Sequence, residues 1–384
     1  MSVVRLVTLT PLHIGDGEVY TRFSYFVHNG YLHFIDSDAF SVLNEQQLEQ
    51  LLQKLAQPVQ KSAGLEDFIA AHPELRPKLA EKAKYRLPHK SGQLPIRDGI
   101  FSFIKSTKGV YIPGSEVKGA LRTAILSSLL SKSPLNSRWQ GLVARFPGGF
   151  KGKTEKDKLS DLEKNLQALA LRARDSSDAK LDLLKFLSIS DSDFKEPSAV
   201  LELARIFLLS RRSPQQGGPR QVQVCEVVKS GTEFTLTINL SSPRVIQEFL
   251  NRFNFEPPQK EQVSRLDAVF QAAYEFYQRV LDEEITFFQS VREVQIVSQL
   301  KGIKQRSQPN SPVIRLGKHQ GFLSTTLACL LKSQAPDFYN DLLRRFVAKR
   351  GTYLGGYPVS RKLVSVGQKG SYLSPGWVQL KVIG

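Results

Sequence analysis

The segment from residue 110 to residue 123 constrains the fold most, because it marks where a strand ends and a helix begins. Its short apolar run stops at Pro113-Gly114, which breaks a strand, and Ser115 is a residue type that caps helices. Ser115, Lys118 and Arg122 then recur at helical spacing, so one face of the predicted helix carries a hydroxyl and two cations. Backbone N–H groups and the dipole at a helix start attract anions. The segment therefore predicts a strand, turn and helix that present an anion-binding face.

A second unit of the same plan lies near the C-terminus. Residues 311–316 predict a strand, Gly317-Lys318-His319-Gln320-Gly321 a glycine loop, and residues 322–331 a helix. Glycines let a sugar-phosphate chain approach the backbone, and flanking Lys and Arg side chains neutralise its charge without reading bases. This second unit therefore predicts a second place for the same kind of ligand.

The remaining pattern supplies strands and one long helix. Residues 1–10 alternate as a strand and end in a glycine turn at 12–17, and residues 222–228 and 233–240 predict a hairpin. Apolar residues at helical spacing predict a helix over 259–289, whereas residues 57–90 form a polar, basic stretch without clear periodicity. Residues 379–383 predict a closing strand.

The length of 384 residues favours two or three domains. Two strand–turn–helix units accompanied by hairpins predict an α+β chain of two ferredoxin-like domains, similar to RNA-recognition motifs. The first is expected over residues 1–230, with a helical insertion around 132–182, and the second over residues 231–384, with the glycine-rich loop at 315–322. The insertion is charge-dense and matches no motif.

Charge indicates the class of ligand. The chain has 53 Lys and Arg against 36 Asp and Glu, and fourteen of the basic residues but only two acidic ones follow residue 300. Such a balance favours a polyanion, with nucleic acid ahead of a membrane because no amphipathic anchor accompanies it. No apolar run reaches eighteen residues and no signal peptide opens the chain, so a cytoplasmic protein is expected.

Several kinds of chemistry find no support. Gly114 and Gly119 have the glycine spacing of a P-loop, but Ala120 and Leu121 stand where its Lys and hydroxyl are required. No histidines pair at short metal-ligand spacing, and Cys225 and Cys329 are isolated, so no metal and no cofactor are expected. Both cysteines are expected to be reduced core thiols.

Acid–base candidates are few. Asp191 and Asp193 could bind a divalent ion, but helix capping is the simpler interpretation. His13 and His319 lie beside glycine turns; His319 could contact phosphate or act as an acid in RNA cleavage, with a structural or RNA-contacting role favoured. The sequence contains no assembled catalytic constellation.

Four motifs together resemble the RAMP superfamily of CRISPR-associated RNA-binding proteins. Residues 10–17 (TPLHIGDG) resemble its strand-one turn, and residues 112–122 (IPGSEVKGALR) are similar to its IPGSSxKGALR helix start, with Glu116 in place of a small residue. Residues 315–322 (RLGKHQGF) resemble its C-terminal glycine loop. Residues 361–363 with 375–378 resemble the ending of one branch, the fifth subunit of the type III-A (Csm) effector complex.

The resemblance implies a non-catalytic RNA-binding subunit of that ribonucleoprotein, with two ferredoxin-like domains. It would cap the backbone filament near the crRNA 3′ portion and support crRNA maturation and antiviral defence. The implied partners are crRNA, target RNA, the neighbouring backbone RAMP subunit and other Csm subunits, and host nucleases that trim crRNA. The residues expected to contact RNA are Gly114, Ser115, Lys118, Gly119, Arg122, Arg315, Gly317, Lys318, His319, Gly321, Arg361 and Lys362.

Two other functions stay open. A metal-independent endoribonuclease of the same superfamily would cut precursor crRNA with His13 or His319 as general acid or base. A backbone subunit would carry a target-cleaving aspartate on a loop over the guide, although no loop of this sequence identifies itself as such.

Overall fold

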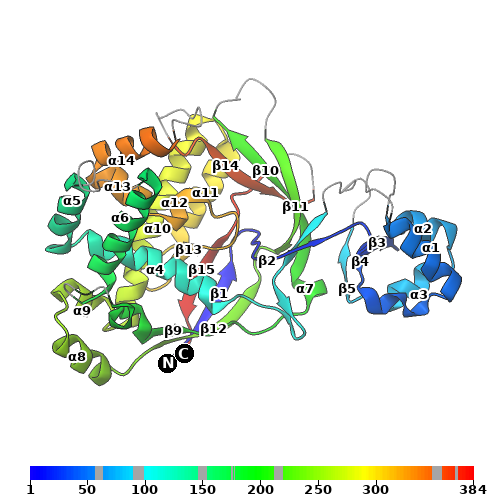
Figure 1. The fold of residues 1–384 in the computed structure, drawn as a ribbon, viewed down its shortest axis with the longest axis horizontal. Helices are drawn as coiled ribbons and strands as arrows, with labels where there is room; N and C mark the ends of the chain where they lie inside the picture. The colour runs from blue at the N-terminus through cyan, green and yellow to red at the C-terminus, as the bar shows by residue number, and fades with distance from the viewer. Residues whose placement is uncertain are drawn as a thin grey trace.

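The computed structural model describes residues 1–56, 64–89, 99–145, 154–173, 176, 178–211, 219–347, 357–367 and 371–384. It is a mixed α+β structure in which two five-stranded sheets lie beside a group of helices, and a smaller lobe projects from one side (Figure 1). The two chain ends lie together, because the Val3 N–H donates to the Gly384 carbonyl at 2.7 Å and the Ile383 N–H donates to the Val3 carbonyl at 2.9 Å.

The first sheet joins strands from the two ends and the middle of the chain. Its order is β13 (Val313–Arg315), β15 (Trp377–Val382), β1 (Ser2–Thr8), β12 (Glu233–Leu240) and β9 (Leu187–Ile189), with every pair antiparallel. The connections run from β1 through helix α4 (Gly114–Leu130) to β9, then from β12 through helix α10 (Leu266–Ser290) to β15. Strand β1 alternates as its sequence predicts, with Val4, Leu6 and Thr8 fully buried.

The second sheet has the order β14 (Ser360–Ser365), β10 (Leu201–Ser210), β11 (Arg220–Val228), β6 (Ile100–Phe103) and β2 (Gly15–Tyr20). Strand β11 is antiparallel to β10 and parallel to β6. Both sheets thus combine strands from either side of residue 230, the boundary expected from the sequence.

The hairpin expected from residues 222–228 and 233–240 is wrong. Both segments are strands, but β11 belongs to the second sheet and β12 to the first. The turn between them is attached to β1, because the Thr8 hydroxyl donates to the Lys229 carbonyl at 2.6 Å and accepts from the Thr232 N–H at 2.9 Å. A turn signal shows that the chain reverses but not which strand becomes the neighbour.

The core lies between the sheets and the helices. Helix α10 packs along α4 and is apolar on most sides, with Val269, Phe270, Phe276, Tyr277 and Leu281 buried. The expected helix over 259–289 is divided into α9 (Pro257–Gln262) and α10. The helix expected over 322–331 is divided into α12 (Gly321–Thr325) and α13 (Ala328–Gln334).

The expected insertion is helical, and it is part of the core. Helices α5 (Leu135–Arg145) and α6 (Glu155–Leu171) pack against α4. Trp139 is completely buried, and Leu162 and Leu166 are nearly so. Residues 146–153, which include its Pro-Gly-Gly turn, lie outside the described residues.

The smaller lobe is built from described residues between 25 and 88, and most of its helices were not predicted from the sequence. Strands β3 (Tyr25–His28), β4 (Tyr31–Phe34) and β5 (Tyr85–Pro88) form its sheet, and α1 (Glu45–Leu55), α2 (Leu65–Ala71) and α3 (Leu75–Glu81) cover one face (Figure 1). Phe26, Leu65 and Phe68 belong to a separate apolar cluster there, whereas Phe34 and Leu87 belong to the main core.

The remaining strands and α-helices are β7 (Lys105–Ser106), β8 (Gly109–Val110), α7 (Pro197–Val200), α8 (Pro243–Arg252), α11 (Val294–Arg306) and α14 (Pro336–Leu342). Within the described ranges, no helix combines the length and the apolar character that crossing a membrane requires.

Candidate nucleic-acid interface

Three of the four sequence motifs meet at one groove of about 470 Å³. The turn after β1, the first turn of α4 and the C-terminal glycine loop each contribute to it. Its lining residues are Ile14, Gly15, Gly17, Glu116, Gly317, Lys318, Gln320, Gly321 and Thr325. The groove is thus lined by four glycines, one exposed cation and one carboxylate.

The glycine loop is seated directly on the turn after β1. Gly317 has a φ of +85°, and a Cβ there would lie 2.2 Å from the His13 carbonyl oxygen. The Lys318 N–H donates to that same carbonyl at 3.0 Å. Gly317 is therefore required both by its left-handed backbone and by close packing.

Two histidines form the layer beneath the groove. His13 is 2% exposed and His319 is 3% exposed, and their rings are nearly parallel with centroids 5.4 Å apart. The His13 Nδ1 lies 2.7 Å from the Glu226 carbonyl oxygen, so this nitrogen carries the proton and donates. Burial lowers the pKa of His13 to about 4. Burial first, and then the Lys362 charge, lower the pKa of His319 to about 2. Both rings are neutral at pH 7.

The start of α4 differs from the expectation in its cap. The helix begins at Gly114 with Pro113 as the cap residue, and Ser115 lies exposed in the first turn without capping it. Instead, the Asp191 carboxylate accepts a hydrogen bond of 2.8 Å from the Gly114 N–H. Asp191 therefore caps α4 across the fold, because Ile112–Gly114 packs against the segment that follows β9.

The open face of α4 carries the other predicted residues of this motif. Gly119 is exposed and has nothing within 4 Å of where a Cβ would stand, and Lys118 is partly exposed. Helical periodicity places Gly119 between Glu116 on one margin of this face and Lys118 on the other. Arg122 is engaged within the protein, since it contacts the Asp182 carboxylate at 3.4 Å and the Gln167 side chain at 3.1 Å.

Two lysines, Lys318 and Lys362, lie close to the buried His319. Lys318 is exposed at the groove, and its ammonium lies 4.5 Å from the centre of the Phe101 ring. Lys362 is half-buried, with its Nζ 3.4 Å from His319 Nδ1. Burial and the nearby Lys318 charge lower the pKa of Lys362.

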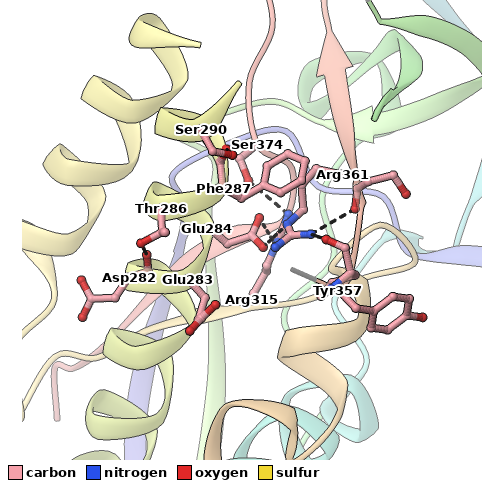
Figure 2. Close-up of polar contacts among 12 residues, drawn as sticks. Asp282, Glu283, Glu284, Thr286, Phe287, Ser290, Arg315, Tyr357, Arg361 and Ser374 are labelled. Atoms are coloured by element: carbon pink, nitrogen blue, oxygen red, sulfur yellow. Dashed lines mark hydrogen bonds and ion pairs between the residues drawn. The ribbon is translucent and has the colours of Figure 1, made fainter. Parts of the chain in front are cut away.

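Arg315 and Arg361 point away from the surface. Figure 2 shows their guanidinium groups beside the carboxylate of Glu284 on α10. Arg315 contacts that carboxylate at 3.3 Å and also donates to the Pro375 carbonyl and the Ser374 hydroxyl. Arg315 is 2% exposed and Arg361 is 7% exposed, so both are paired in the core of this structure. Both arginines were expected to contact RNA because they lie in or near basic, glycine-containing motifs. Nothing in the local sequence indicates that they pair with Glu284, which lies on the distant helix α10.

The groove is also lined by residues that the sequence analysis did not include among the RNA contacts: Ile14, Gly15, Gly17, Glu116, Gln320 and Thr325. Gly15 and Gly17 fall in the turn expected at 12–17, but the structure places both in strand β2, and Glu116 stands out as the departure from the motif. Thr325 follows the motif and carries no signal of its own.

Comparison with known proteins defines the family. The family model of the RAMP superfamily matches residues 5–284 of this chain. This chain belongs to the RAMP superfamily. This RAMP protein is 23% identical over 416 aligned residues to a curated relative, the CRISPR system Cms protein Csm5 of Methanocaldococcus jannaschii, covering 99% of this chain and 88% of the relative.

Solved structures show the same fold along the whole RAMP chain. A chain of the cryo-EM structure of a Csm–crRNA–target RNA ternary complex of a type III-A CRISPR-Cas system matches with a TM-score of 0.71 at 21% identity, covering 99% of this chain and 100% of that one. The crystal structure of T. onnurineus Csm5 matches with a TM-score of 0.67 at 22% identity, with the same coverage.

Proposed function

We propose that this RAMP protein is a non-catalytic, RNA-binding subunit of a type III-A (Csm) ribonucleoprotein. The observation that carries the proposal is the groove in which the three family motifs converge, lined by glycine backbone and the exposed Lys318. Glycine-lined backbone and a cation suit a sugar-phosphate chain. Similarity along 99% of the chain to Csm5, and to a chain of a Csm complex containing crRNA and target RNA, supports the assignment.

Only part of the sequence-predicted set is suitably exposed for RNA contact. Ser115, Lys118, Gly119, Lys318 and Gly321 lie at least partly at the surface, and Gly321 lines the groove. In the proposed function Gly114, Gly317, His319, Arg315 and Arg361 shape the site from within. Arg122 joins α4 to the inserted helices, and Lys362 supports the loop at His319.

The proposal includes the architecture expected from the family. The first sheet runs β1–α4–β9–β12–α10–β15 with strand order β15-β1-β12-β9, which is the arrangement of a ferredoxin-like βαββαβ unit with β13 added at its edge. We assign the second unit to the sheet centred on β10 and β11. The two units are therefore not consecutive in sequence, because segments of one alternate with segments of the other along the chain.

In the complex, the protein would cap the backbone filament in the cytoplasm near the crRNA 3′ portion, beside a backbone RAMP subunit. Host nucleases would then trim the exposed end of the crRNA. Purification of the tagged protein from its host, followed by sequencing of bound RNA and identification of co-purifying subunits, tests this. Recovery of crRNA with Csm subunits is expected; recovery of neither would contradict the proposal.

The endoribonuclease alternative is disfavoured by the burial of both histidines. A general acid or base must reach the atom whose proton it transfers. Incubation of the full chain with repeat RNA in EDTA is expected to leave the RNA intact. Specific cleavage that is lost on His13→Ala or His319→Ala would establish the enzyme instead.

A further inference from the structure

One cluster beneath the groove is unused by the proposed function. His13 from the turn after β1, Cys225 from β11 and His319 from the glycine loop are all buried, and one potential ligand atom from each lies within 4.8 Å of the others. These residues are far apart in sequence, and the short spacings of zinc motifs are absent. We propose that His13, Cys225 and His319 form a binding site for a zinc-class divalent metal ion.

His13 is already oriented as a ligand. Its Nδ1 donates to the Glu226 carbonyl at 2.7 Å, which fixes the tautomer and leaves the lone pair on Nε2. That Nε2 is buried and has no hydrogen-bond partner among the described residues. A ring held by a backbone carbonyl through one nitrogen and open at the other is the usual arrangement of a metal-ligating histidine.

The spacing of the two rings also fits a shared ion. With Zn–N bonds of about 2.0–2.1 Å in tetrahedral geometry, the centroids of two imidazole ligands lie about 5 Å apart. The centroids of His13 and His319 are 5.4 Å apart. Binding needs the three ligand atoms to close from within 4.8 Å to about 3.5 Å, a movement of roughly 1 Å, and one ring to turn out of the stacked arrangement, in which the ring planes lie 16° apart.

The donor types select the ion. Two imidazoles and a thiolate favour zinc, cobalt or copper over magnesium or calcium, which prefer oxygen. Binding would convert the Cys225 thiol to a thiolate and release its proton to solvent, since burial raises the pKa of the free thiol. Three protein ligands leave a fourth position for water.

Nearby positive charges repel a bound metal ion, so removing one of them should change the affinity for the metal in a predictable direction. The charged groups that act on the histidines are Lys105, Lys318, Lys362, Arg315 and Asp16. Both ring nitrogens of His319 have a neighbour, since the Lys362 Nζ lies 3.4 Å from Nδ1 and the Gln223 Nε2 lies 3.2 Å from Nε2, so the neighbour of the ligating nitrogen must move when an ion binds. Since Lys362 is only half-buried, its ammonium can swing outward when an ion binds. Lys362→Met should therefore tighten metal binding by roughly tenfold.

The bound ion would join the turn after β1, strand β11 and the glycine loop, which together support the groove floor. This inference does not depend on RNA binding. The test uses the tag-free, full-length protein, stripped of metal and titrated with Co²⁺ in the absence of RNA. We expect one Co²⁺ per chain with a thiolate-to-cobalt absorption band.

Cysteine variants assign the band. The chain has only two cysteines, so a band that persists in Cys329→Ser must come from Cys225, even if Cys225→Ser fails to fold. If circular dichroism shows that Cys225→Ser is folded, the thiolate-to-cobalt band should be absent in this variant and its affinity for Co²⁺ should be roughly 100-fold lower. Absence of saturable Co²⁺ uptake by the wild type, or a band retained in Cys225→Ser or lost in Cys329→Ser, would overturn the metal site.

Discussion

Gly114 and Gly119 belong to one family motif, but their surroundings differ. A Cβ on Gly114 would lie 2.3 Å from the Ile189 carbonyl oxygen, whereas a Cβ on Gly119 would meet nothing within 4 Å. Gly114 is therefore needed by the fold. The described residues impose no such need at Gly119. Under the proposed function, a glycine there lets RNA approach the helix backbone closely.

The two alanine variants should separate these roles. Gly114→Ala should lower the free energy of unfolding by about 1–3 kcal/mol through overpacking. Gly119→Ala should raise it by up to about 1 kcal/mol through helix propensity, while weakening RNA binding. Urea unfolding and RNA titration of both variants measure this. Equal stability losses in the two variants would contradict the packing account.

The buried histidines make stability depend on pH. The folded-state pKa is about 4 for His13 and about 2 for His319, below the ordinary value of 6.5. Below pH 6.5 the unfolded chain takes up protons that the native state refuses. Their stabilising contribution is therefore complete above pH 6.5 and is lost as the pH falls toward 4 for His13 and lower for His319.

In metal-free protein, each histidine should add a slope of up to about 1.4 kcal/mol per pH unit below pH 6.5. Urea unfolding in steps between about pH 7 and pH 5, where few carboxylates titrate, measures the slope. The double variant His13→Asn with His319→Gln should have a shallower dependence. An unchanged slope would show that the rings are not held neutral in the native state.

At the scale of elements, the lobe of β3–β5 and α1–α3 has a cluster of its own. Phe68 on α2 is fully buried in that cluster, whereas Leu52 on α1 is 56% exposed. The opposite face of its sheet contributes Phe34 to the main core. The lobe should therefore unfold as a local unit, with helices α1–α3 opening before the two large sheets.

Phe68→Ala should cost about 3–5 kcal/mol, confined to the lobe. Hydrogen exchange is expected to accelerate in the described parts of residues 45–81 and to stay unchanged in β1 and α10. Leu52→Ala is the matched control, with little expected effect on exchange. Faster exchange throughout the molecule in the Phe68→Ala variant would mean that the lobe and body unfold together.

For the whole molecule, local pattern predicted much of the element list but not the partners of each element. Strand β1 and helix α4 follow their sequence periods, and the C-terminal glycine loop occurs where expected, whereas the turn expected at 12–17 ends earlier because Gly15 begins strand β2. The predicted neighbour of an element was wrong where a segment distant in sequence determines the contact. The Thr8 hydroxyl hydrogen-bonds to the turn before β12 and so attaches it to the first sheet. Glu284 on α10 forms ion pairs with Arg315 and Arg361, which are buried in the core.

The same limit applies to the site. The family motifs identified the segments that line the groove, because each motif is local. The cluster of His13, Cys225 and His319 could not be predicted, since its members meet only through tertiary packing. The glycine loop packs on the turn after β1, and that turn pairs with β11, which carries Cys225.

The net charge of +17 attracts any polyanion, so the central claim concerns where RNA binds. Lys118 and Lys318 lie on the open face of α4 and at the groove. Lys301 and Lys381 are exposed residues that do not line it, and their reversal changes the net charge equally. The two pairs therefore provide a matched comparison.

The most direct measurement is the affinity of the full chain for single-stranded RNA over a range of salt concentrations. Lys118→Glu with Lys318→Glu should weaken binding at least about tenfold at physiological salt and reduce the salt slope by roughly 1–2 units. Lys301→Glu with Lys381→Glu should have a much smaller effect. Equal losses in the two double variants, or unchanged binding in the first, would contradict the groove as the RNA site.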